Sequence, residues 1–169
     1  MLVLWILGCN GINQSEAELI FSALYEPLSD IRDAAIESTE DEISISINLG
    51  ASWEGEATAS GTKTQSDLKE IFPLTVTLSE IYVASSDVTL DGTLSFGIEY
   101  FLDPTDVTSY EKTATVDGEL TVSGDANGIA DVAYQFTELF DNQTGNLIYS
   151  ASGTISQIDV SPFTYGSEE

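Results

Sequence analysis

The spacing of apolar residues along the chain changes once, near residue 40. Between Ser15 and Ala35, apolar residues recur every three or four positions, which is the period of an amphipathic helix. Ser15 and Glu18 form a capping box that predicts where this helix begins. Pro27 predicts either a kink or the first turn of a second helix. The apolar stripe consists of Ala17, Ile20, Phe21, Leu24, Leu28, Ile31 and Ala35.

From Ile43 onward, apolar and polar residues alternate, as they do in strands with one buried face. A change of phase near Ser79 predicts a β-bulge. Short turn segments separate the alternating runs, so successive strands should pair as hairpins. These turns are 85–87, 124–128 and 141–146, and the runs begin at Ile43, Trp53, Phe72, Val88, Ala114, Val132 and Leu147.

The pattern therefore predicts a mainly β, α+β fold with an N-terminal helix. We expect an antiparallel meander of about seven strands, with the helix packed on its apolar face. A curved sheet, a partly open barrel and a sandwich all fit the pattern.

A short repeat places glycine in the middle of two strands. The segment 89–95 resembles 115–121, and each has a Gly at an inward position, Gly92 and Gly118. Gly weakens a strand unless the missing side chain is used. These glycines predict strong coiling of the sheet, or close packing of a bulky neighbour such as Trp53 or the helix. A shared binding groove is the alternative.

The charge balance is strongly acidic. Four basic residues face 29 acidic ones, for a formal net charge of −25. Such a surface repels phosphate backbones, so we expect no nucleic-acid partner. Solubility is the simplest interpretation of the acidic surface, and binding of calcium or of a basic partner is the alternative. The 169 residues, 42% of them hydrophobic, fit one domain with a real core.

Several classes of catalytic site are excluded by composition. The chain has no His and one Cys, so it cannot form a Ser-His-Asp triad, a Cys-His dyad or a His/Cys zinc site. It has no P-loop and no dinucleotide-binding glycine motif. We expect a non-enzymatic protein without a cofactor.

One segment is loosely similar to a calcium loop. Asp125, Asn127 and Asp131 lie around Gly128, but an EF-hand needs more ligands and flanking helices. An Asn-Gly hairpin turn explains the same residues. They are therefore weak metal candidates.

The N-terminus carries the clearest motif. Apolar residues run from Leu2 to Leu7 and are followed by Gly8 and Cys9. This segment resembles the lipobox of bacterial lipoproteins, with Ile6 at position −3 and Gly8 at −1. The resemblance implies removal of residues 1–8 and attachment of diacylglycerol to the Cys9 thiol.

Two further expectations concern this end of the chain. No Lys or Arg precedes the apolar run, so we expect the true start to lie upstream of Met1. By the sorting rule of lipoproteins, Asn10 permits the outer membrane. The alternative is a buried N-terminal strand in which Cys9 is a small apolar side chain.

The expected organisation is a signal peptide at 1–8, a lipidated tether at 9–14, one domain at 15–160 and an acidic tail at 161–169. The expected function is that of an envelope lipoprotein, anchored to the outer membrane, with a structural or binding role. A carrier or chaperone for an apolar ligand between helix and sheet is the first alternative. A calcium-dependent adhesin is the second.

Overall fold

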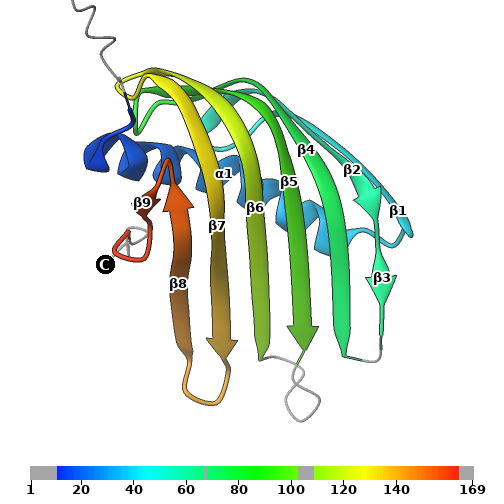
Figure 1. Ribbon diagram of the computed structural model, residues 1–169. Coiled ribbons are helices and arrows are strands. Elements are labelled where there is room, and N and C mark those ends of the chain that lie inside the picture. The colour runs from blue at the N-terminus through cyan, green and yellow to red at the C-terminus, as the bar shows by residue number, and fades with distance from the viewer. Residues whose placement is uncertain (1–10, 67, 103–108, 164–169) are drawn as a thin grey trace, which may run out of the picture.

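An antiparallel sheet curls around one helix (Figure 1). The computed structural model describes residues 11–66, 68–102 and 109–163. Within these ranges, helix α1 spans Gln14–Glu37 and is followed only by strands. The predicted α+β fold, with the helix on the apolar face of the sheet, is confirmed.

The strands follow one another as a meander. Their order across the sheet is β1-β2-β4-β5-β6-β7-β8-β9, and β3 pairs with β4 beside this path. The sheet does not close, because β1 and β9 lie at opposite ends of that order. The two strands beyond the seven expected, β3 and β9, are two residues long. The bounds are β1 Glu42–Leu49, β2 Trp53–Thr62, β3 Thr64–Gln65, β4 Lys69–Val83, β5 Val88–Leu102, β6 Tyr110–Gly124, β7 Gly128–Asp141, β8 Asn146–Ile155 and β9 Ile158–Asp159.

The start of α1 differs from the prediction. The backbone N–H of Glu16 donates to the Asn13 side chain (3.2 Å), and the N–H of Asn13 donates to the Glu16 carboxylate (2.8 Å). The capping box is therefore Asn13–Glu16 rather than Ser15–Glu18. Asn caps a helix as well as Ser does, and burial of Ile12 brings the chain into the core before Ser15 is reached.

The interior of α1 follows the predicted stripe. All seven stripe residues are buried. Pro27 lies inside one continuous helix, so it does not begin a second one. The predicted bulge in β4 is also present, because the pairing register with β5 shifts between Leu78 and Ile81. Glu80, within that shift, has a positive φ of 51°.

The mid-strand glycines are covered by leucines of the adjacent strand. Gly92 pairs with Leu120, and Gly118 pairs with Leu94. Their φ angles, 152° and 148°, are rarely adopted by residues with a side chain. The leucine Cδ2 atoms lie 2.8 Å and 3.0 Å from the positions that Cβ atoms would take. The nearest neighbours of these glycines are therefore leucine side chains and backbone atoms of the adjacent strand, rather than the expected Trp53 or helix.

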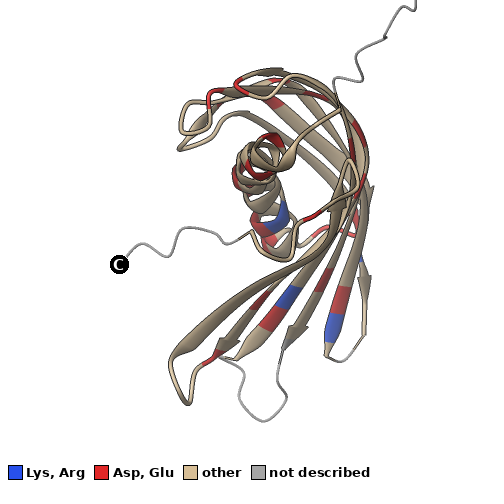
Figure 2. Ribbon diagram, turned by 60° about the vertical axis from the view of Figure 1, so that its left-hand side comes forward, with Lys and Arg blue, Asp and Glu red and all other residues tan. Residues whose placement is uncertain are grey.

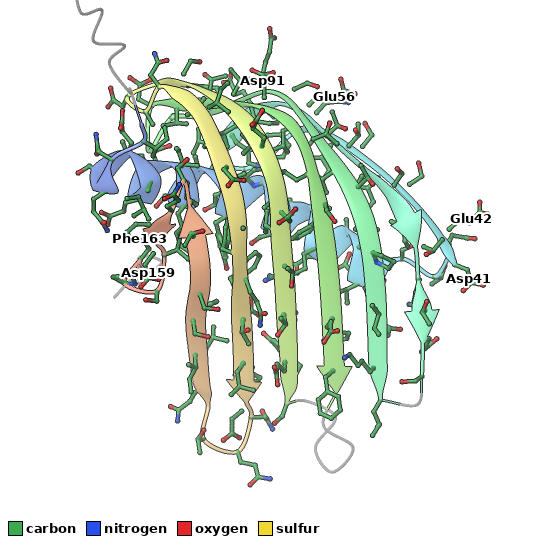
Figure 3. All side chains as sticks on the ribbon, viewed as in Figure 1. Asp41, Glu42, Glu56, Asp91, Asp159 and Phe163 are labelled. Atoms are coloured by element: carbon green, nitrogen blue, oxygen red, sulfur yellow. The ribbon has the colours of Figure 1, made fainter. Side chains whose placement is uncertain are left out.

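The folded part extends slightly beyond the expected limits of 15 and 160. Ile12 and Phe163 are each 7% exposed, and both belong to the core. The Phe163 ring, labelled in Figure 3, lies 5.7 Å from the ring of Phe21 on α1. Cys9, residues 1–8 and the end of the predicted tail at 164–169 lie outside the described residues.

Candidate functional site

Helix α1 covers only part of the sheet, and the lower ends of β4 to β8 in Figure 1 extend beyond it. The cross-strand row Phe72, Ile98, Ala114 and Phe136 is buried. One step farther along the same face, Glu70, Tyr100 and Lys112 are half-buried, whereas Glu138 is buried. We call the part of β4 to β8 beyond this row the distal end.

A cluster of charged residues marks the border between the covered sheet and the distal end. Arg32 of α1 is 3% exposed. Its Nη2 lies 3.1 Å from Glu138 Oε2 on β7, and its Nε lies 3.0 Å from Asp33 Oδ1. Lys112 Nζ lies 3.3 Å from Asp33 Oδ1 and 3.5 Å from Glu138 Oε1. Tyr110 completes the cluster by donating its hydroxyl to Glu138 Oε1 at 2.8 Å.

Two members of this cluster, Tyr110 and Arg32, have raised pKa values. Burial and the hydrogen bond to the Glu138 carboxylate both raise the pKa of Tyr110. Burial lowers the pKa of Arg32, but the carboxylates of Asp33 and Glu138 outweigh it and leave the pKa raised. Tyr110 and Arg32 therefore keep their protons at pH 7, and neither is poised for acid–base chemistry there.

Aromatic side chains continue the concave face beyond this cluster. The ring of Tyr110 lies 6.4 Å from Tyr100 and 5.5 Å from Phe140. Leu147 and Tyr149 of β8 are about half exposed on this face, at 45% and 46%. The distal end therefore presents apolar surface that α1 does not cover.

The convex face of the distal end has a groove beside Phe101. The cross-strand row there is Phe101, Glu111, Leu139 and Ile148. A hollow of about 400 Å³ at the ends of β5, β6 and β7 is lined by Phe101, Glu111 and Leu139 and also by Tyr110 and Phe140. A second hollow of about 190 Å³ is lined by Phe101, Glu111, Lys69, Glu99 and Thr113. Phe101, Leu139 and Ile148 are all exposed. Apolar surface is thus available on both faces of the distal end.

All four basic residues of the chain are engaged in ion pairs. Besides Arg32 and Lys112, Lys63 Nζ lies 2.8 Å from Glu70, and Lys69 Nζ lies 2.7 Å from Glu99. Figure 2 shows cations on the helix and on the lower parts of the sheet, whereas acidic residues are spread over the whole fold. Glu56 and Asp91, for example, project outward from the convex side (Figure 3).

The space between α1 and the sheet is filled by side chains. Leu24, Leu28 and Ile31 of α1 and Leu94 and Phe96 of β5 are at most 1% exposed. These side chains therefore border no space that a water molecule can enter. An acyl chain could enter here only if α1 moved.

The weak metal candidates do not converge. Asp125 and Asn127 lie in the turn between β6 and β7, whereas Asp131 lies on β7 opposite Glu119. Across the described ranges, no group of three or more His, Cys, Asp or Glu side chains is placed to hold a metal ion. The predicted Asn-Gly hairpin is present between Gly124 and Gly128.

In the part of the chain that the structure describes, no helix is long and apolar enough to span a membrane.

Pattern reasoning did not identify the charged cluster, although the chain contains a signal for it. Glu138 occupies an inward position of the alternation that includes Val132, Tyr134 and Phe136. A carboxylate in such a position needs a buried partner. Arg32 is the residue that meets this need, but α1 and β7 are far apart in the sequence.

No protein-family profile, curated protein or solved structure matches this chain.

Proposed function

We propose that this chain is an envelope lipoprotein, anchored to the outer membrane through Cys9, whose domain has a non-enzymatic structural or binding role. The observation that carries the proposal is the lipobox pattern Ile6–Cys9 directly before the folded domain. Only Asn10 and Gly11 separate Cys9 from Ile12, which is buried. A lipid on Cys9 would therefore hold Ile12 within about 10 Å of the membrane surface.

This short connection gives the domain an orientation. The first described residues lie at the top of Figure 1, and the distal end lies at the bottom. In a protein anchored at Cys9, the distal end would face away from the membrane. The exposed apolar residues there, including Phe101 and Tyr149, would be available to a partner.

A binding role is supported more strongly than catalysis. The chain has no His, and the pKa values of Tyr110 and Arg32 are raised away from neutrality. The filled interface between α1 and the sheet also gives the carrier hypothesis less support than a role for the surface.

Labelling with a radioactive fatty acid tests the anchor. The gene, with its natural upstream region, is expressed in a bacterium as wild type and as Cys9→Ala. We expect label on the wild type in the membrane fraction, and no label on the variant, which should be released into the soluble fraction. Cys9 is the only cysteine, so no other thiol can take the label. An unlabelled wild type, or equal label on both proteins, would contradict the proposal.

A further inference from the structure

Strand β8 has one side without a strand partner over most of its length. On one side it pairs with β7 from Asn146 to Ile155. On the other side, β9 pairs only with Thr154 and Ile155. Among the described residues, no strand pairs with the other side of 146–152. The N–H and C=O groups on that side therefore form an edge that another strand could join.

This edge lacks the usual protection against strand addition. Proteins protect exposed edges with charged side chains, proline or bulges. The segment from Asn146 to Ile155 contains no charged residue and no proline. By contrast, the opposite edge at β1 begins with Asp41 and Glu42, which Figure 3 shows at that end of the sheet. The β8 edge also exposes Leu147, Ile148 and Tyr149.

The charge distribution makes this edge suitable for a second copy. Two chains with a net charge of −25 repel each other, so they can meet closely only where acidic side chains are absent or paired. On the convex face, the β7 residues beside β8 are Ala133, Gln135, Thr137, Leu139 and Asp141, and of these only Asp141, opposite Asn146 at the start of β8, is charged. On the concave face, Glu138 lies opposite Tyr149 and is paired with Arg32.

We propose that β8 pairs antiparallel with β8 of a second copy across a two-fold axis, so that the two sheets become continuous. Centred on Tyr149, such pairing places Leu147 of one copy opposite Ala151 of the other. It satisfies the free backbone groups of 146–152 in both copies and forms a closed, self-complementary interface. This inference goes beyond the proposed function and applies to chains that are not anchored in the same membrane, because antiparallel pairing places the N-terminal end of one copy beside the distal end of the other.

Sedimentation velocity on the full chain carrying Cys9→Ala tests the dimer. Sodium chloride is raised from about 0.1 M to about 1 M, which shortens the Debye length from ~10 Å to ~3 Å. Screening reduces repulsion between the acidic copies, so we expect the dimer Kd to fall by about tenfold or more. A basic partner strand would show the opposite salt dependence.

A matched pair of variants locates the interface. Ile148→Lys introduces a charge on the β8 edge, whereas Ile129→Lys makes the same change at the start of β7 on the same convex face. Both side chains are exposed, at 54% and 64%, so both variants should fold, which circular dichroism checks. We expect Ile148→Lys to raise the dimer Kd by about tenfold or more, and Ile129→Lys to leave it nearly unchanged.

Hydrogen exchange supplies a second measurement. Backbone amides on the unpaired side of 146–152 should gain protection as the protein concentration rises. A monomer at both salt concentrations, assemblies larger than a dimer, or a dimer unaffected by Ile148→Lys would each overturn the proposal. Exchange in 146–152 that does not depend on concentration would also overturn it.

Discussion

The guanidinium of Arg32 and the carboxylate of Glu138 lie 3.1 Å apart between helix α1 and strand β7, and both side chains are buried. The pair ties the helix to the sheet at the point where the covered part of the sheet ends. Because each charge is withdrawn from water, each depends on its partner.

Removal of one partner should therefore destabilise the fold. We expect Glu138→Leu to lower the free energy of unfolding by about 3 kcal/mol, because Arg32 then keeps only Asp33 as an ion-pair partner in the cluster. The double variant Arg32→Leu/Glu138→Leu should lose less than the sum of the single losses. Urea unfolding measures each value. The exposed pair Lys69–Glu99 is the control, since Glu99→Gln should cost under about 1 kcal/mol. If the loss of unfolding free energy in the double variant equalled the sum of the two single losses, the two side chains would not be coupled.

Tyr134 has a buried hydroxyl, and among the described residues this hydroxyl has no hydrogen-bond partner. A buried polar group without a partner is costly, so Tyr134→Phe should raise the free energy of unfolding by about 1 kcal/mol. Thermal and urea unfolding at pH 7 measure this change. A clear loss of stability in the variant would mean that the hydroxyl has a partner.

The same residue predicts a dependence on alkaline pH. Burial raises the pKa of Tyr134 above its ordinary value of 10.0. The unfolded chain then releases this proton at lower pH than the folded chain does. The free energy of unfolding therefore keeps its full value below about pH 10. It falls above that pH, by up to ~1.4 kcal/mol per pH unit for each such tyrosine. Urea unfolding curves can be measured from about pH 8 to about pH 11. Over this range, the free energy of unfolding should fall less in Tyr134→Phe than in the wild type. Equal slopes would contradict the prediction.

Two glycines of β5 should respond differently to alanine. At Gly92 the φ angle is 152°, and a Cβ would lie 2.7 Å from the Glu119 carbonyl oxygen. We expect Gly92→Ala to destabilise the protein by about 2 kcal/mol or more. At Gly97 the nearest atom would be Thr115 Cβ, 4.0 Å away, so Gly97→Ala should be neutral or slightly stabilising. Melting temperatures of both variants check this contrast. Similar decreases in melting temperature for the two variants would show that the backbone conformation at Gly92 does not determine the cost of adding a side chain.

Salt should stabilise the monomer as well as the dimer. Sodium chloride screens repulsion among the 29 acidic residues, so the melting temperature should rise with its concentration.

The adhesin hypothesis predicts an additional rise in melting temperature with millimolar calcium, compared with sodium at equal ionic strength. Asp131→Asn removes one carboxylate from the weak metal candidates Asp125, Asn127 and Asp131, and its calcium response is compared with that of the wild type. Calcium stabilisation that is lost in this variant would favour the adhesin. A calcium effect equal to that of sodium would remove its support.

Much of the fold was predictable because it depends on near neighbours in the chain. The helical stripe from Ala17 to Ala35, the strands, the turns and the bulge near Ser79 follow from local backbone geometry and from which side chains must avoid water. The helix start was predicted less accurately. Asn13 and Ser15 are both good caps, and each has a Glu three residues later, so the sequence allows either start. In the folded protein the cap is Asn13, directly after the buried Ile12.

The candidate site depends instead on contacts between segments that are distant in the sequence. The pairing of Arg32 with Glu138 and of Gly92 with Leu120 requires the packing of α1 and the register of the strands. Whether the sheet closes is likewise decided by its total curvature, so the free edge of β8 could not be derived from the alternation in 146–155. The apolar pattern by itself determined the elements and their buried faces. The tertiary structure decided which charges are paired and which edge is left open, because both depend on how the strands and helix are placed in space.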